Sequence, residues 1–443
     1  MTKFSLKKKL LPSLMAASLA SGVAFSGSAS ALEVAADGTG QVLLAPVYIV
    51  NVKGSPQGPS YIRVINTSPD HAVKARIGFR SQVNSTEVLD FILYLSPRDV
   101  WRGMVVNVNG QAYVKSTDDS VRNLPNADSF ASIEGTPANV MMFDVALSAD
   151  DNNEMGHFEI IGAYSVKDTV KTPKGSVTIQ QGMSKFDLAK IFDTPLGSAA
   201  VPDSLLALNN ADCPAGATGT CMIRTDEASS VQLRGEVSMV LLGERYSYRM
   251  TALDADDKGN VISNPFYDVE VKFGTNIGSD FPGAGLDNIL DIETALAAKS
   301  YGATYENADG AASIVFVTFP TKYRHLRSDV CQIGKIEGPW TPPFNATGSM
   351  GYTISQFDNQ EHGVGNTVEP PTSVSGDLAA TPSAGTAITP EVEWFLPAWK
   401  FASGWYSLDM KARTGCPYSG APAIVYTMTL RNNSSEFIQN SPR

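Results

Sequence analysis

Short runs of β-branched and aromatic residues, separated by turn-forming clusters, recur along most of the chain. Within residues 88–95, Leu89, Phe91, Leu93 and Leu95 fall on one side, as the two-residue period of a strand requires. Strands spaced in this way predict an all-β fold, made mainly of antiparallel β-sandwich domains with long loops. We expect strands at 42–52, 61–66, 72–79, 88–95, 140–147, 157–166, 176–181, 231–242, 246–252, 267–273, 313–319 and 423–431, and another that begins at Val100.

Two segments carry the spacing of a helix instead. In the first, 184–193, Ser184 can cap the helix, with Asp187 three positions further on. In the second, 287–299, the apolar residues Ile292 and Leu296 are four positions apart, and acidic residues gather near the N-terminus. We expect two short helices that cover sheets.

The first 31 residues predict a cleaved export signal. Four lysines precede an apolar run at 10–25, and Ala29-Ser30-Ala31 offers the small residues that a signal peptidase requires. This run is too short to span a bilayer, and no later apolar run reaches about 18 residues, so we expect no membrane span. The chain is therefore expected to be exported, to the cell surface, the extracellular medium or the periplasm.

The exported part is long enough for two domains. We expect an N-terminal β-sandwich domain at 32–170 and a second β-rich domain at 171–443. Residues 363–390 are rich in Gly, Pro, Ser, Thr and Ala, which predicts a long flexible loop within the second domain.

The charge balance is acidic, with 45 Asp and Glu against 34 Lys and Arg, a net charge of −11. Removal of the four signal lysines takes it to −15. Nucleic acids and anionic lipids bind clustered Lys and Arg, so this balance argues against both as partners. Divalent cations could instead bridge such acidic surfaces.

Four cysteines, Cys213, Cys221, Cys331 and Cys416, form an even set in a compartment expected to be oxidising. Three pairings are possible. The short flexible loop between Cys213 and Cys221 favours a disulfide there, which leaves Cys331 to pair with Cys416. A zinc site is the weaker interpretation, because no Cys-x-x-Cys spacing occurs.

Two acidic stretches offer hard oxygen ligands for calcium. The second stretch, which contains Asp254 and Asp256, begins like an EF-hand loop. However, Lys258 takes a ligand position, and Pro265 stands where the bidentate glutamate belongs. The alternative for this stretch is therefore a solvated hairpin tip. Bound calcium would let a chain that repels its own copies pack closely. The candidate ligands are Asp150, Asp151, Asn153 and Glu154 in the first stretch, and Asp254 and Asp256 in the second.

A group of aromatic residues near carboxylates is the best candidate for a ligand-binding face, because aromatic rings stack on sugars. The alternative is that these rings fill the core, the commoner fate of large aromatics. The aromatic residues are Trp394, Trp399, Trp405 and Tyr406, and the carboxylates are Glu361, Glu391, Glu393 and Asp409.

The chain contains five distinctive segments, at residues 89–101, 156–161, 317–322, 404–405 and 420–424. Taken together and in this order, they resemble segments of a group of exported, largely uncharacterised proteins of Gram-negative bacteria. The resemblance spans most of the exported chain and implies a β-rich protein of the cell surface, such as a surface layer or extracellular matrix component. It implies no catalytic residues. The chain departs from the group at Ile92, Arg98 and His157, which bears on packing.

No hydrolase, metalloprotease or nucleotide-binding motif occurs after residue 31, and the four histidines lie far apart in the sequence. We therefore expect no enzymatic activity and assign no catalytic residue. The leading hypothesis is an exported structural protein of the cell surface, surface layer or extracellular matrix that self-associates. The alternative is a secreted protein that binds or acts on carbohydrate, such as cell-envelope glycan. A third possibility is a periplasmic carrier or assembly partner.

Overall fold

The structure is a computed structural model that shows an all-β protein. Every strand pair among its described residues is antiparallel. The described residues are 32–52, 55–82, 87–122, 143–147, 154–172, 175–185, 187–188, 231–241, 243–255, 292–322, 325, 340–360, 362–366, 392–415, 420–431 and 436–442.

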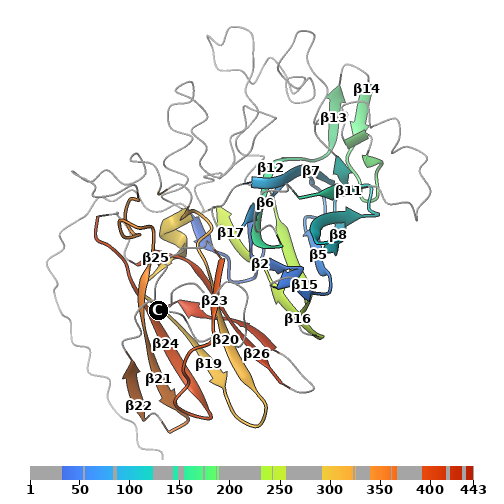
Figure 1. The fold of residues 1–443 in the computed structure, drawn as a ribbon. Coiled ribbons are helices and arrows are strands. Elements are labelled where there is room, and N and C mark those ends of the chain that lie inside the picture. The colour runs from blue at the N-terminus through green and yellow to red at the C-terminus, as the bar shows by residue number, and fades with distance from the viewer. Residues whose placement is uncertain are drawn as a thin grey trace, which may run out of the picture.

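Two large sheets form the first sandwich, at the right of Figure 1. In spatial order, sheet A contains β1 (Leu32–Val34), β17 (Thr251–Ala255), β2 (Val42–Ile49), β12 (Met155–Val166), β6 (Ala72–Ser81), β7 (Glu87–Leu95) and β10 (Val121–Arg122). Sheet B contains β11 (Phe143–Ala146), β9 (Gln111–Ser116), β8 (Val100–Val108), β5 (Ser60–Asn66), β15 (Leu233–Leu241) and β16 (Glu244–Arg249).

The second sandwich, yellow to red in Figure 1, comes from the C-terminal part of the chain. Sheet C contains β22 (Gly363–Asn366), β21 (Gly351–Asp358), β24 (Ser403–Lys411), β19 (Ser300–Glu306) and β28 (Ser441–Pro442). Sheet D contains β23 (Val392–Phe395), β20 (Ala312–Thr318), β26 (Ile424–Leu430) and β27 (Glu436–Gln439). The two-stranded pairs are β3 (Asn51–Val52) with β4 (Ser55–Pro56), β13 (Thr169–Thr172) with β14 (Gly175–Thr178), and β18 (Ala297–Ala298) with β25 (Ala421–Pro422).

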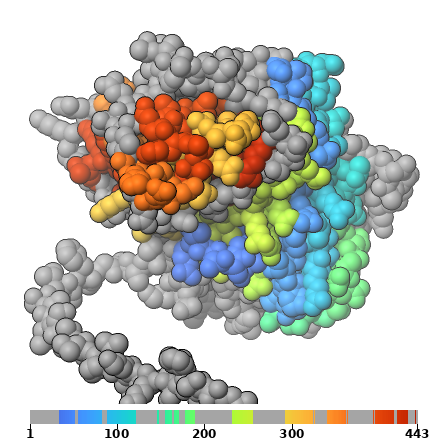
Figure 2. All heavy atoms as spheres, turned by 90° about the horizontal axis from the view of Figure 1, so that it is seen from below, coloured from blue at the N-terminus to red at the C-terminus, as the bar shows by residue number. Residues whose placement is uncertain are grey.

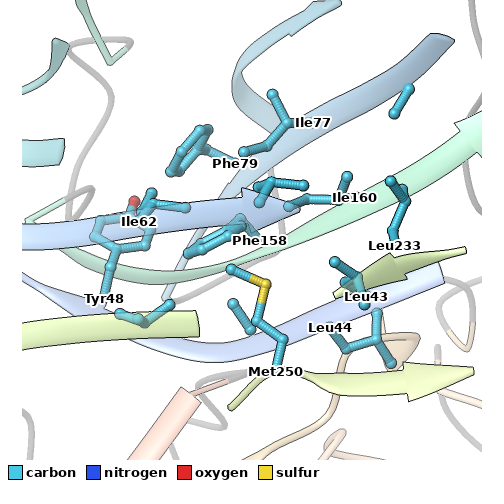
Figure 3. Close-up of a cluster of buried hydrophobic side chains, with 14 of the residues drawn as sticks. Leu43, Leu44, Tyr48, Ile62, Ile77, Phe79, Phe158, Ile160, Leu233 and Met250 are labelled. Carbon is cyan, nitrogen blue, oxygen red and sulfur yellow. The ribbon is translucent and has the colours of Figure 1, made fainter. Parts of the chain in front are cut away.

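The core of the first sandwich is made by side chains that alternate inward along both sheets. Phe79, Phe91 and Phe158 of sheet A meet Trp101 of sheet B, and the rings of Phe91 and Trp101 lie edge to face at 5.7 Å between centroids. Figure 3 shows Phe79 and Phe158 with their aliphatic neighbours. Burial of such apolar surface stabilises the fold by roughly 25 cal/mol per Å².

Strands β20 and β26 of sheet D are buried on both faces, and the sheet joins the two sandwiches. Along β20, Ile314 and Phe316 belong to the core of the first sandwich, whereas Val315 and Val317 pack toward sheet C. The same alternation divides β26. A strand buried on both sides reads as a continuous apolar run, which is why both strands were recognisable in the sequence.

Three sequence-based boundaries are wrong. Strand β15 pairs with β5 and β16, and β17 pairs with β2, so the first sandwich reaches Ala255 and the expected boundary at residue 170 falls inside it. Residues 363–366 pair with β21, so the expected loop 363–390 begins in a strand. The second helix is confined to residues 292–296 of the described chain, because 297–298 pair with 421–422 as extended backbone.

The other expected strands and the first expected helix agree in type with the observed elements wherever the residues are described. Residues 185, 187 and 188 are helical, inside the segment 184–193. The expected strand at 267–273 lies outside the described residues, as do the export signal at 1–31 and the remainder of the long loop. No described helix is long or apolar enough to cross a membrane.

Candidate functional site

The four predicted aromatic ligand residues do not share one face. Trp394 is 4% exposed and stacks on Phe316 in the core that joins the sandwiches. Tyr406 is fully buried between sheets C and D, where its hydroxyl lies 2.7 Å from both Thr427 Oγ1 and Asn440 Nδ2. These two rings are therefore part of the core.

The other two aromatics are half-buried, each stacked on a neighbour at 4.0 Å between ring centroids. Trp399 stacks on Tyr305, and its indole N–H donates to the Ser313 carbonyl at 2.8 Å. Trp405 stacks on Phe357 on the outer face of sheet C. Trp405 alone of the four thus lies on an outward sheet face.

The carboxylates near these aromatics are only partly placed. Asp409 shares the outer face of β24 with Trp405 and accepts a hydrogen bond from Ser407 Oγ at 3.0 Å. Glu361 and Glu391 lie outside the described residues. Glu393 is opposite Val317 in the sheet D pairing, on a different sheet from Trp405. Of the four predicted carboxylates, the described chain therefore brings Asp409 alone to the face of Trp405.

The predicted calcium ligands are also divided. Glu154 accepts a hydrogen bond from Asn51 Nδ2 at 2.9 Å, and burial raises its pKa. Asp254 lies within β17, opposite Glu33 of β1, and so belongs to a paired strand. Among the described residues, no three His, Cys, Asp or Glu side chains gather as a metal site. Asp150, Asp151, Asn153 and Asp256 lie outside those residues.

All four cysteines, Cys213, Cys221, Cys331 and Cys416, lie outside the described residues. The pairing of Cys213 with Cys221 and of Cys331 with Cys416 stays a prediction.

A buried acid–imidazole–hydroxyl array was not predicted. His325 Nε2 lies 2.6 Å from Glu293 Oε1, and His325 Nδ1 lies 3.2 Å from Thr341 Oγ1. This is the order of groups in a nucleophilic triad, but Glu293 and His325 are fully buried, and Thr341 Oγ1 donates to the His325 carbonyl at 3.1 Å. A nucleophile needs access to its substrate, so this array links segments rather than reacting. The three residues are 32 and 16 positions apart, a separation that no local pattern could reveal.

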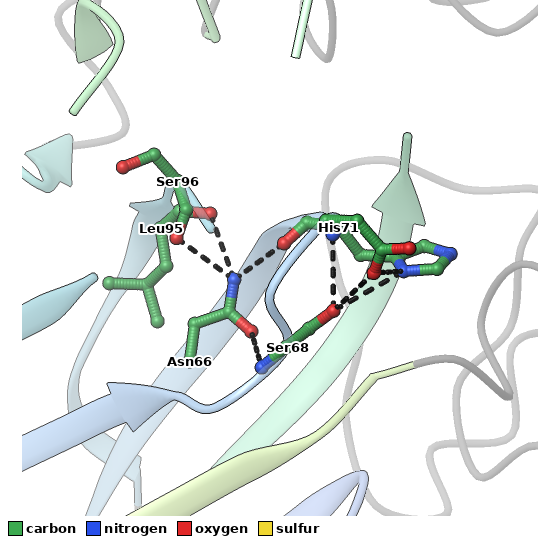
Figure 4. Close-up of polar contacts among 6 residues, drawn as sticks. Asn66, Ser68, His71, Leu95 and Ser96 are labelled. Carbon is green, nitrogen blue, oxygen red and sulfur yellow. Dashed lines mark hydrogen bonds and ion pairs between the residues drawn. The ribbon is translucent and has the colours of Figure 1, made fainter. Parts of the chain in front are cut away.

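A second set of Ser, Asp and His side chains lies in the turn between β5 and β6 (Figure 4). Ser68 Oγ and Asp70 Oδ1 both approach the same ring nitrogen, His71 Nδ1, at 3.3 and 2.8 Å. A proton relay requires the acid and the hydroxyl on opposite ring nitrogens. Beside this set, Asn66 Nδ2 donates to the carbonyls of His71 and Ser96 at 2.7 and 3.0 Å. The network therefore ties two turns together.

A buried charged cluster lies on the face of sheet A that points away from sheet B. Arg80 Nε donates to both carboxylate oxygens of Glu159, at 2.9 and 3.1 Å, and both side chains are buried. A methyl group on Gly78 would lie 3.0 Å from Glu159 Oε1 and 2.9 Å from Arg76 Nη1, so this glycine leaves room for the charged groups. The cluster is therefore a buried ion pair, and the absence of a side chain at Gly78 leaves the room that its charged groups occupy.

His157 is directly opposite Arg80 in the pairing of β12 with β6. It is buried, and neither ring nitrogen has a hydrogen-bond partner within the described part of the chain. Burial, reinforced by the Arg80 charge, lowers the pKa of His157 to about 3. The imidazole is therefore neutral at physiological pH and acts as a packing group.

The charged cluster lies close to the contact between the sandwiches. Gln82, just after β6, exchanges two hydrogen bonds with Val392 of β23, at 3.2 and 3.4 Å. The alternation of Lys74, Arg76 and Arg80 along β6 was visible in the sequence, but such a pattern is normally that of a solvated face. The neighbouring contact of Gln82 with Val392 joins residues 310 positions apart, which no local pattern could reveal.

Comparison with known proteins does not assign the chain to a family. No protein-family profile matches the chain, and no curated protein or solved structure shows significant similarity to it.

Proposed function

We propose that this chain is an exported, non-enzymatic structural protein of the cell surface, surface layer or extracellular matrix that self-associates. The observation that carries this proposal is the shared core of the two sandwiches. Trp394 and Phe316 of sheet D pack within the same hydrophobic cluster as Leu43 and Tyr248 of the first sandwich. Such a joint core favours one stiff building block over two domains that move around a cleft.

The buried polar groups support the same proposal. The Arg80–Glu159 pair and the Glu293–His325–Thr341 array lie inside the protein and hold separate segments together, although Glu293 Oε2 has no hydrogen-bond partner among the described residues. Groups arranged in this way contribute to specificity of the fold and do not reach a ligand. Rigidity is what a repeating unit of a surface assembly requires.

The edge strands of the sheets limit the ways in which copies of the chain could associate. Apart from β16, the edge strands of the four large sheets have two to four residues. Short edge strands discourage edge-to-edge pairing. We therefore propose that copies associate through loops and side-chain faces, with divalent cations reducing the repulsion between acidic surfaces.

The test is the state of the protein released from the cells that export it. We expect ordered assemblies in electron microscopy and sedimentation, which EDTA dissolves and calcium restores, and we expect fractionation to find the chain outside the cytoplasm. A protein that stays monomeric at high concentration with calcium, or one that remains in the cytoplasm, would contradict the proposal.

A carbohydrate-binding function is the second candidate, favoured by one observation. Trp405 and Phe357 form a stacked pair on the outer face of sheet C, next to the hydroxyl of Ser407. An aromatic platform beside small polar groups suits a neutral sugar. A rise in melting temperature with a neutral glycan, abolished by Trp405→Ala, would favour this candidate over the structural one.

A further inference from the structure

The outer face of sheet B carries an unusual set of side chains for an acidic protein. The register places them in two rows across four adjacent strands, β8, β5, β15 and β16, whose blue, cyan and yellow-green atoms lie side by side at the surface in Figure 2. One row is Arg102, Arg63, Glu236 and Arg249, and the other is Met104, Tyr61, Ser238 and Ser247.

The first row and its neighbours are positively charged. Arg63, Arg102, Arg245 and Arg249 are all exposed, while Glu236 is the acidic member of the two rows and pairs with Arg63. Among the described residues, no carboxylate forms an ion pair with Arg102, Arg245 or Arg249. The whole chain has a net charge of −11, so this face has the opposite sign to the protein that carries it.

The face is hollowed where the second row crosses it. A groove of about 340 Å³ is lined by Tyr61, Arg63, Arg102, Glu236, Ser238 and Arg245, among others, and Glu236 is the one acidic residue among them. Tyr61 is 45% exposed, which leaves much of a large aromatic ring open to solvent. Arg245 Nε donates to Ser238 Oγ at 2.7 Å, and Ser247 Oγ lies 2.9 Å from the same oxygen, so the floor is a small hydroxyl network.

We infer that this groove binds an anionic polysaccharide, a glycan whose sugar units carry carboxylate or sulfate groups. Guanidinium groups present planar pairs of N–H donors that match carboxylate and sulfate oxygens. Tyr61 offers a ring on which a sugar can stack, and the serine hydroxyls can bond sugar hydroxyls. The aromatic ring and hydroxyls together favour a saccharide over a simple anion.

The charge of the rest of the chain confines such a ligand to this face. An acidic surface repels a polyanion, whereas the arginine row attracts it, so binding is steered to one orientation. The inference concerns a different sheet from Trp405 and does not depend on self-association.

The experiment measures binding of the full exported chain to polygalacturonate, which carries carboxylates, to dextran sulfate and to neutral dextran. We expect binding to at least one polyanion and none to dextran, with the stronger polyanion identifying the acid group preferred. Affinity should fall with salt, because exposed charges are screened.

Variants locate the site. Arg102→Ala and Tyr61→Ala should each weaken binding of the preferred polyanion at least fivefold, and Arg102→Ala should also reduce its salt dependence, whereas Tyr61→Ala should not. Lys167→Ala removes one positive charge from an exposed position outside this face and should bind like the parent. Circular dichroism of each variant checks that it is folded.

Three results would overturn the inference: no binding to either polyanion, equal binding to dextran, or variants that bind like the parent. A loss of self-association in Arg102→Ala without any polyanion binding would instead identify a second copy of this chain as the occupant. Sedimentation without polysaccharide tests the structural proposal separately, so the two can fail independently.

Discussion

At the scale of residues, the most informative groups are charged or polar side chains that sequence patterns assign to the surface but that are buried here. The Arg80–Glu159 pair is one example, and removal of one partner of such a pair typically costs about 3–5 kcal/mol because the other charge is left buried. His157, opposite Arg80, is another example, and its burial has a consequence for pH dependence.

The pKa of His157 is about 3 in the folded protein, well below the usual 6.5. Between these values the unfolded chain binds the proton and the folded protein does not, so stability is complete above pH 6.5 and falls as the pH is lowered toward 3. We expect His157 to contribute up to about 1.4 kcal/mol of lost stability per pH unit in this window.

The measurement is urea unfolding of the parent and of His157→Leu between pH 7.5 and pH 4. The variant should lose less stability on acidification, since Leu cannot titrate. His362→Gln serves as the control for the loss of a histidine, because the His362 side chain is exposed and lies outside the buried cluster of sheet A. Parallel curves for the parent and His157→Leu would show that folding leaves the pKa of His157 near its usual value.

At the scale of elements, the strands that sequence patterns locate best are those buried on both faces. Strands β2, β6, β20 and β26 are almost wholly buried and have strong apolar content, so each was expected near its observed position. In contrast, β19 and β21 are built from Ser, Gly, Thr and Tyr, a composition that also suits loops, and they were missed. Both strands pair with β24, and this long-range pairing, which their own sequences do not reveal, holds them in extended form.

The same limit applies to the candidate site. The sequence located the aromatic segment but could not tell which faces its strands present. In β24, Trp405 and Tyr406 are adjacent and therefore point to opposite sides, one outward and one into the core. The groove on sheet B escaped notice because Tyr61, Arg102 and Ser238 are brought together only by strand pairing.

Trp394 of sheet D and Trp405 of sheet C allow a prediction at this scale, because they are the same type of residue but differ in burial. Trp394→Ala should destabilise the protein by about 3–5 kcal/mol, since it opens a cavity in the joint core. Trp405→Ala, on the outer face of sheet C, should cost clearly less. Denaturant unfolding of both variants measures the difference. Equal losses would mean that Trp394 does not bear on the packing between the sandwiches.

At the scale of the whole molecule, the contacts between the sandwiches are specific as well as apolar. Tyr426 of β26 donates its hydroxyl hydrogen to the Arg249 carbonyl at 2.8 Å, and its ring packs against Tyr248. Thr318 Oγ1 donates to the Pro46 carbonyl at 2.7 Å. Neither half can unfold without exposing sheet D and these buried partners, which couples the stability of the two halves.

We therefore expect the exported chain to unfold in one cooperative transition, although its length would allow two domains. Calorimetry should give a calorimetric enthalpy equal to the van 't Hoff enthalpy. Trp394→Ala should lower the temperature of the single transition rather than divide it, as long as the hydrogen bonds of Tyr426 and Thr318 hold the sheets together. Two separated transitions in the parent protein would mean that the shared core contributes less than the cores within each sandwich, and the view of the molecule as one stiff unit would fail with it.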